Sequence, residues 1–420
     1  GIVRRAMRSG SRLPAPDPDP FAEIAPPLTR DAALAEANRC LYCFDAPCTK
    51  ACPTHIDVPA FIKKIATGNL KGSARVILDA NPMGHSCARA CPVDVLCEGD
   101  CVLNERDIKP INIALLQRVA TDYAIEKKLQ LFKPGPDTGK HVAIVGAGPA
   151  GLSCAQDLRR WGHAVTIYEA KPLPGGLNTY GIAEYKLRAP TAQAEAQMVL
   201  DLGVTLKTGL KIGKDIPLEQ LVREYDAVFI AVGLGATGRL GIPGEDKDGV
   251  VEALRFIETL KTRPASEVKV GRRVVVIGAG NTAIDAVTQA KRLGAETSTI
   301  VYRRGEADMP AYDYEYELAR KDGCDFRFHC VPKEIVGPSK VEGLRVTTPA
   351  GEETIPCDMV IKALGQTRRA DFEIPNDPRV FAGGDCANGG KEIVNAAADG
   401  KAAAAAIHRL FGGTDGRPPR

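Results

Sequence analysis

The chain has 420 residues, of which 44% are hydrophobic and 25% are charged, and its formal net charge is +3. This length predicts two to three domains with sizeable cores. The balanced charge gives no electrostatic argument for binding to nucleic acid or to a membrane surface, and no apolar run reaches the roughly 18 residues of a membrane span.

The cysteines are unevenly distributed, because eight of the 13 lie between Cys40 and Cys101. A long, enzyme-like chain with no evident signal peptide argues against a disulfide framework and for metal ligation in a reducing compartment. We therefore expect a cytoplasmic protein. The proline-rich and arginine-rich residues 1–30 predict an extended tail ahead of the cysteines.

Two cysteine arrays follow a helical pattern that starts at Asp31. They read Cys40-x2-Cys43-x4-Cys48-x3-Cys52-Pro53 and Cys87-x3-Cys91-Pro92-x4-Cys97-x3-Cys101. Each contains a Cys-Pro step, and in two-cluster ferredoxins the cysteine before the proline ligates the other cluster. This spacing predicts that Cys40, Cys43 and Cys48 hold one iron–sulfur cluster and that Cys52 crosses to a second.

Structural zinc is the main alternative for these cysteines. Zinc sites usually pair two C-x2-C knuckles, and only Cys40 and Cys43 have that spacing. Reduced structural cysteines are the remaining alternative. The spacing favours iron–sulfur clusters over both.

A dinucleotide-binding fingerprint follows a helical pattern over 111–127 and a Pro/Gly linker over 133–139. An apolar strand over 142–145 runs into Gly146-x-Gly148-x-x-Gly151, and a helix and a second strand ending at Glu169 come next. The glycines permit close approach of the backbone to a pyrophosphate, the helix N-terminus attracts it, and the acid can bind a ribose hydroxyl.

A second fingerprint, Gly278-x-Gly280-x-x-Ala283, lies between a strand and a helix over 282–293. Its second strand ends in Arg303-Arg304 instead of an acid. Arginine makes charge-assisted contacts with phosphate, so this pair predicts binding of a ribose 2′-phosphate and a preference for NADP(H). A solvated basic turn is the alternative.

Glycine-ended strands complete the pattern. Apolar runs end at Gly233 and Gly365, and Val380-Phe-Ala-Gly-Gly-Asp385 leads into a helix over 392–410. We expect an α/β protein with two Rossmann-like dinucleotide-binding domains, one inserted in the other, preceded by an α-helical domain with two [4Fe-4S] clusters. The expected divisions are a tail over 1–30, the cluster domain over 31–132, an FAD-binding domain over 140–270 and 372–411, an NAD(P)H-binding domain over 271–371, and a tail over 412–420.

Taken in order, the segments GAGPAG, PGGL, GAGNTA, YRR and VFAGGD resemble the flavoprotein half of glutamate synthase and dihydropyrimidine dehydrogenase. The resemblance covers roughly residues 21–411. The cysteine arrays and INIALLQRVATDYA are most similar to the N-terminal portion of dihydropyrimidine dehydrogenase. Within the family, the chain resembles the small (PreT-type) subunits of the bacterial enzyme.

The resemblance implies one cluster on Cys40, Cys43, Cys48 and Cys101 and the other on Cys52, Cys91, Cys97 and Gln117. Spacing alone favours Cys87 over Gln117 as the eighth ligand, so the two arguments conflict, and we follow the family. For FAD we expect Gly146, Gly148, Pro149, Ala150, Gly151, Glu169, Gly176, Leu177, Lys186, Gly233, Gly384, Asp385, Lys391, Glu392 and Ile393. For the nicotinamide nucleotide we expect Gly280, Asn281, Thr282, Ala283, Arg303, Arg304, Ala363, Leu364 and Gly365.

The implied function is electron input. The resemblance implies that NADPH reduces FAD, with NADH as the alternative donor, as in relatives that carry an acid at the position of Arg304. Two clusters then pass single electrons to an FMN- and iron–sulfur-containing partner subunit that reduces uracil or thymine. No protein nucleophile or base is expected, because hydride transfer is chemistry of the cofactor, and the six histidines are expected to be surface or packing residues. The alternatives are a glutamate synthase small subunit, a stand-alone NAD(P)H:ferredoxin-type oxidoreductase, and a non-catalytic cluster-bearing assembly module.

Overall fold

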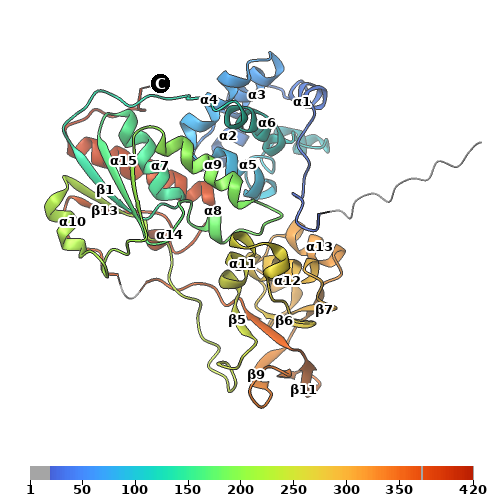
Figure 1. Ribbon diagram of the computed structural model, residues 1–420. Coiled ribbons are helices and arrows are strands. Elements are labelled where there is room, and N and C mark those ends of the chain that lie inside the picture. Colours follow the sequence, from blue (N-terminus) through green and yellow to red (C-terminus); the bar gives the residue numbers. More distant parts are fainter. Residues whose placement is uncertain (1–18, 370–371, 420) are drawn as a thin grey trace, which may run out of the picture.

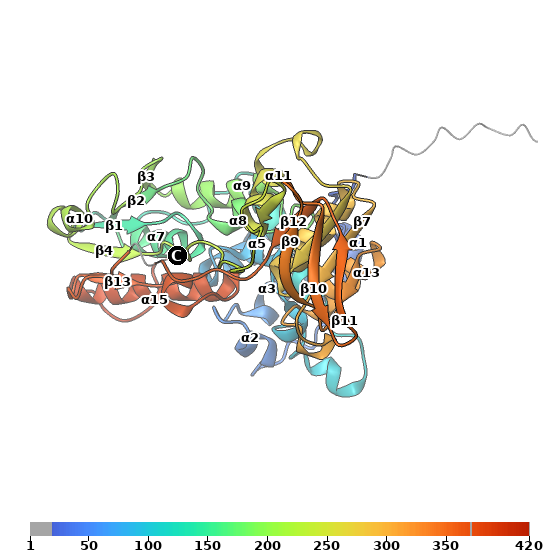
Figure 2. The ribbon, with the colours of Figure 1, turned by 90° about the horizontal axis from the view of Figure 1, so that it is seen from below.

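The computed structural model describes residues 19–369 and 372–419. Figures 1 and 2 show a helical part packed beside two separate parallel sheets. Within the described residues, no helix combines the length and the apolar character that crossing a membrane requires. Residues 1–18 of the predicted tail lie outside the described part.

The N-terminal part is helical, and three of its helices begin after a residue whose side chain caps them. The side chains of Thr29, Asp57 and Asn69 each accept a hydrogen bond from a backbone N–H in the first turn of the following helix, which is the usual N-cap interaction. The elements are α1 (Arg30–Ala37), α2 (Pro47–Ala51), α3 (Val58–Ala66), α4 (Leu70–Ala80), α5 (Gly84–Ala90), η1 (Val93–Val95), η2 (Val102–Arg106) and α6 (Ile113–Glu126).

The first sheet has the order β13-β4-β1-β2-β3, and all its strands are parallel. Its central strands β1 and β4 are almost wholly buried, as expected of a parallel sheet covered on both faces. The strands are β1 (His141–Val145), β2 (Ala164–Glu169), β3 (Thr205–Thr208), β4 (Ala227–Ile230) and β13 (Val380–Ala382). The helices are α7 (Pro149–Arg160), α8 (Leu177–Tyr180), α9 (Ala189–Leu200), α10 (Leu218–Glu224), α14 (Asp385–Asn388) and α15 (Ile393–Leu410), with α15 packed along α7.

The second sheet repeats this plan in the order β5-β12-β6-β7-β8, again parallel. A small antiparallel sheet, β11-β10-β9, packs beside it. The strands are β5 (Val250–Glu252), β6 (Arg273–Ile277), β7 (Thr297–Val301), β8 (Asp325–Arg327), β9 (Val331–Val336), β10 (Gly343–Thr348), β11 (Gly351–Pro356) and β12 (Met359–Lys362). The helices are α11 (Ala253–Thr262), η3 (Ala265–Glu267), α12 (Asn281–Arg292), η4 (Glu306–Asp308) and α13 (Asp313–Lys321).

The second sheet is inserted in the first, because the chain leaves the first sheet after β4 and returns to it at β13. The outgoing and returning segments run side by side, with Gly235 N donating to Thr367 O at 2.7 Å and Thr367 N donating to Ala236 O at 3.2 Å. The nested Rossmann-like fold is therefore confirmed. However, β5 at Val250–Glu252 pairs with β12 in the second sheet, so the change of sheet precedes the expected division at residue 271. The three-residue β5 carries too little apolar pattern to be recognised in the sequence.

The helical part is fixed to the first sheet by buried polar contacts. Glu195 of α9 accepts hydrogen bonds from the backbone N–H groups of His85 and Ser86 at 2.8 and 3.0 Å. Arg160 of α7 donates to Asp79 of α4 at 2.8 Å, and both side chains are buried. The two terminal segments also pack on the protein: Phe21 is buried in the core of the second sheet, and Pro419 O accepts from Arg160.

Candidate functional site: two cysteine sets and two dinucleotide loops

The first cysteine set surrounds one cavity. Cys40, Cys43, Cys48 and Cys101 all line it, together with apolar side chains that include Ile62. Burial, together with the neighbouring thiols of Cys101, Cys40 and Cys43, raises the pKa of Cys48 to about 12. Cys101 thus joins three cysteines of the other array, although more than 50 residues separate it from Cys48 in the sequence.

The second cysteine set gathers around the Cys-Pro steps. A hydrogen bond with Cys87 and burial raise the pKa of Cys91, and the thiols of Cys97 and Cys52 add to this effect. Burial, Glu98 and Cys52 raise the pKa of Cys97 in turn. Cys52 therefore lies with cysteines of the second array, as the crossing pattern of a two-cluster ferredoxin predicts.

Gln117 and Cys87 compete for the eighth ligand position. Gln117 lies on α6 with its side chain buried, and its Nε2 donates to Gly84 O at 2.6 Å. The thiol of Cys87 is also buried and accepts from Asn81 Nδ2 at 3.3 Å. Cys87 contacts Cys91 of the second set, and Gln117 contacts α5, the helix that ends before Cys91, so the choice of Gln117 stays a prediction.

In residues 19–369 and 372–419, no three His, Cys, Asp or Glu side chains converge as ligands of a single metal ion. A four-iron cluster differs from a single ion because each cysteine binds a different iron, so its ligands surround a volume instead of meeting at a point. The thiol-lined cavity of the first set and the grouping of Cys52, Cys91 and Cys97 fit such clusters.

The first fingerprint forms a tight loop between β1 and α7. Gly146 has φ 108°, and a Cβ there would lie well under 3.0 Å from Ala231 O at the end of β4. Only glycine permits this approach. The carboxylate of Glu169, at the end of β2, accepts from Ala147 N in the loop at 2.8 Å. The acid is therefore beside the loop, where a nucleotide ribose would follow the pyrophosphate.

Two further segments meet this loop. Gly176 of the PGGL turn packs against Gly148, and Gly384 packs against Ala150, each so closely that a Cβ would overlap its neighbour. Burial raises the pKa of Asp385, the residue after Gly384. The structure thus brings the GAGPAG, PGGL and VFAGGD segments together, and these residues fit a flavin dinucleotide.

The second fingerprint has the same geometry. Gly278, after β6, has φ 128°, and a Cβ there would overlap Ala363 O at the end of β12. Asn281 starts α12, and its side chain accepts from Tyr312 N at 3.1 Å. Thr282 and Ala283 follow in the helix, while Leu364 and Gly365 are exposed beyond β12.

Arg303 and Arg304 follow β7, the strand that corresponds to β2 with Glu169 at its end. Both are exposed, and neither forms an ion pair with a described carboxylate. Arg304 lies over the ring of Tyr302, 5.6 Å from its centroid. Two unpaired guanidinium groups beside a dinucleotide loop fit a phosphate.

Lys186 has a different environment from the flavin-contacting position that was expected. Its ammonium is buried and pairs with Asp285 of α12 and Glu315 of α13, both at 2.6 Å. Lys186 thus connects the two dinucleotide-binding parts, and its contact with FAD stays a prediction. Sequence reasoning missed Asp285 and Glu315 because only the folded chain brings them to Lys186.

The helical part and the two dinucleotide-binding parts come close together near the start of α15. Tyr312 OH donates to Glu392 Oε1, the N-cap residue of α15, at 2.6 Å. Burial and Glu392 raise the pKa of Tyr312, and so does Asp94, which lies between Cys91 and Cys97. The second cysteine set is therefore near both the second fingerprint and the helix start expected to contact a flavin. Lys391 and Ile393 flank Glu392 there, and Gly233 lies in the outgoing segment after β4.

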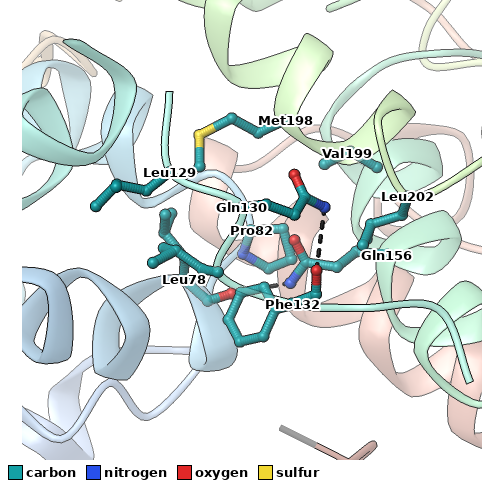
Figure 3. Close-up of a pocket in the computed structure, with 10 residues that line it drawn as sticks. Leu78, Pro82, Leu129, Gln130, Phe132, Gln156, Met198, Val199 and Leu202 are labelled. Atoms are coloured by element: carbon teal, nitrogen blue, oxygen red, sulfur yellow. Dashed lines mark hydrogen bonds between the residues drawn. The ribbon is translucent and has the colours of Figure 1, made fainter. Parts of the chain in front are cut away.

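A separate small cavity lies in the seam between α4, α7 and α9 (Figure 3). It is lined mainly by apolar side chains such as Leu78, Phe132 and Met198. Its two amide side chains are already engaged, with Gln156 donating to Leu78 O and Gln130 donating to Phe132 O. This cavity therefore belongs to the packing interface between the helical part and the first sheet.

Comparisons with known proteins give matches along most of the chain. Residues 18–129 match the family described as dihydropyrimidine dehydrogenase domain II, 4Fe-4S cluster, and residues 140–400 match pyridine nucleotide-disulphide oxidoreductase. The NAD-dependent dihydropyrimidine dehydrogenase subunit PreT of Escherichia coli O157:H7 is 37% identical over 93% of this chain and 97% of that protein. The glutamate synthase [NADPH] small chain of Halomonas elongata is 34% identical over 92% of each chain.

A solved structure shares the fold of the two dinucleotide-binding parts. Mycobacterium tuberculosis FprA in complex with NADPH aligns with a TM-score of 0.57 and 21% identity, over 66% of this chain and 85% of that one.

Proposed function

The chain belongs to the iron–sulfur flavoprotein family of the small subunits of bacterial dihydropyrimidine dehydrogenase and glutamate synthase, and we propose that it is the electron-input subunit of a dihydropyrimidine dehydrogenase. It is an FAD- and iron–sulfur-dependent pyridine-nucleotide oxidoreductase. The observation that carries the proposal is that cysteines from both arrays form two sets, one of them beside the junction of two dinucleotide loops.

The chain's own residues bind and orient the reactants. The first loop and Glu169 would hold FAD, and the second loop would hold the nicotinamide nucleotide, because in each the backbone can approach a pyrophosphate at a helix start. The N-terminus of α15 would favour negative charge on a reduced ring. When bound, FAD would supply a hydride acceptor that can release its two electrons singly, and the clusters would supply one-electron carriers.

NADPH is the proposed electron donor. The unpaired Arg303 and Arg304 offer charge-assisted hydrogen bonds to a 2′-phosphate. The relatives differ in this respect, since the Escherichia coli protein is named NAD-dependent and the Halomonas elongata chain is named for NADPH. NADH is the alternative donor.

The positions of the two cysteine sets support a route by which electrons would leave the chain. Asp94, between Cys91 and Cys97 in the sequence, is close enough to Tyr312 to raise its pKa. This proximity supports the second set as the one that would receive electrons from the flavin. The first set is beside the exposed side chains of Leu41, which is 56% accessible, and Phe44, which is fully accessible. We infer that electrons leave from the first set to a partner subunit that contains FMN and iron–sulfur clusters and reduces uracil or thymine. The working assembly would be a hetero-oligomer.

The isolated chain tests the redox part of this proposal. The purified chain should contain FAD and close to eight iron atoms, as two four-iron clusters require. It should oxidise NADPH with artificial dyes but not with uracil. Iron near two atoms per chain or fewer would contradict the two-cluster assignment, and a chain without flavin absorbance would favour a non-catalytic assembly module.

A glutamate synthase small subunit is the second candidate, supported by the 34% identical relative. Both candidates use the same electron-input machinery and differ in the partner. A stand-alone NAD(P)H:ferredoxin-type oxidoreductase would instead purify without a partner and reduce ferredoxin.

A further inference from the structure

We propose that His329 is a specificity-determining residue for the ribose 2′-phosphate of NADPH and completes a phosphate subsite with Arg303 and Arg304. This inference rests on the proposed function, because it extends the nicotinamide-nucleotide site described there. The sequence does not reveal it, since His329 lies beyond α13 and outside every recognised motif.

The backbone fixes His329 beside the arginine turn. His329 N donates to Arg304 O at 3.0 Å, and Cys330 N donates to Tyr302 O at 3.0 Å. These two bonds lie beyond the ends of β7 and β8 and hold the two segments together. A Cβ placed on Gly305 would lie 3.2 and 3.3 Å from Cε1 and Nε2 of the His329 ring. The imidazole is therefore against the turn that carries both guanidinium groups.

The backbone of His329 lies in a region that few non-glycine residues occupy. Its φ is 54°, in the left-handed region that glycine and asparagine adopt at lower cost. Strained backbone of this kind often occurs at functional sites. Asparagine would satisfy the same backbone, so the imidazole itself needs an explanation.

The imidazole is exposed and available to a ligand. Within the described residues its ring nitrogens have no hydrogen-bond or ion-pair partner, and the side chain is on the surface. Two exposed arginines without carboxylate partners lie on the same turn. These three donors lie around one turn and have no protein acceptor in the described part of the chain, an arrangement that the oxygens of a phosphate can satisfy.

The carboxylate of Asp308 lies on the arginine turn, so a third hydrogen-bond donor beside Arg303 and Arg304 would strengthen phosphate binding. Asp308 accepts from Gly305 N at 3.1 Å, so the turn that would receive a phosphate also carries a carboxylate. This carboxylate would repel a phosphate bound at the turn. A donor from His329, on the neighbouring strand end, would offset that repulsion.

The test measures binding of 2′,5′-ADP and 5′-ADP to the flavin-loaded protein, since these probes differ only in the 2′-phosphate. His329→Asn and His329→Gly both suit the backbone and remove the imidazole. We expect each to weaken 2′,5′-ADP about tenfold, as for the loss of one hydrogen bond to a charged group. Binding of 5′-ADP should be unchanged, and the KM for NADPH should rise relative to that for NADH.

The arginine double variant Arg303→Ala with Arg304→Ala separates this inference from the proposed function. If it loses 2′,5′-ADP binding while both His329 variants bind normally, the role of His329 is overturned and the NADPH site stands. If the unaltered protein does not distinguish the two probes, the NADPH assignment and the role of His329 are both overturned. Equal weakening of both probes in the His329 variants also overturns the inference.

Discussion

Gly278→Ala should abolish use of the nicotinamide nucleotide and leave the flavin in place. Gly278 has φ 128°, and its Cβ would overlap Ala363 O at well under 3.0 Å. The left-handed backbone costs about 1–3 kcal/mol for alanine, and relieving the overlap costs about 1–3 kcal/mol more. The loop would relieve it by moving away from β12, so the pyrophosphate would lose its backbone N–H groups. At roughly 1.5–3 kcal/mol for each hydrogen bond to a charged group, losing two would weaken binding at least about 100-fold.

Gly294→Ala is the matched control. Gly294 follows the other end of α12, has φ 105°, and has no atom within 4 Å of the Cβ position, so it carries the backbone strain without the overlap. The assay is dye-coupled NADPH oxidation, with flavin absorbance and thermal unfolding measured on the same samples. Gly294→Ala should lose some stability and keep its KM for NADPH. If the two variants lose equal stability and both keep normal NADPH kinetics, the assignment of this loop is refuted.

Three further changes test other parts of the molecule. Gln117→Ala should alter the electron paramagnetic resonance spectrum and potential of one cluster, whereas Cys87→Ala should not, and the reverse result would make Cys87 the ligand. Burial raises the pKa of Glu195 from an ordinary 4.5 to about 7. Ionising this carboxyl therefore costs free energy in the folded state but not in the unfolded state. The free energy of unfolding should fall as pH rises from about 5 through 7. In the Glu195→Gln variant, the pH-dependent fall in the free energy of unfolding should be smaller by about 3 kcal/mol. If urea unfolding gives the variant the same pH profile as the unaltered protein, the raised pKa of Glu195 is contradicted. Phe44→Ser should slow electron transfer to the partner and leave dye reduction unchanged, while a loss of both activities would argue against an exit at the first cysteine set.

Local pattern predicted much of this fold. The strand ending at Glu169, the glycine loops at Gly146 and Gly278, and the long C-terminal helix all have strong apolar periodicity beside glycine turns. The return of β13 to the first sheet followed from the order of the motifs. These features depend on residues close together in the sequence.

Features that depend on tertiary packing were not predictable in the same way. The antiparallel sheet β9-β10-β11 has short, half-polar strands, and its clearest signal is the Pro-Ala-Gly turn before β11. The contacts of Lys186 with Asp285 and Glu315, and of Glu195 with α5, join residues separated by more than 90 positions. No spacing rule links such residues, because packing of separate helices brings them together.

Purification of the chain with its native partner tests the central claim most directly, when the complex is assayed with NADPH plus uracil and, separately, with NADPH plus 2-oxoglutarate and glutamine. We predict uracil-dependent NADPH oxidation by the complex and none by the chain alone. Oxidation that depends on 2-oxoglutarate and glutamine, with no response to uracil, would contradict the pyrimidine-reducing assignment and identify a glutamate synthase subunit.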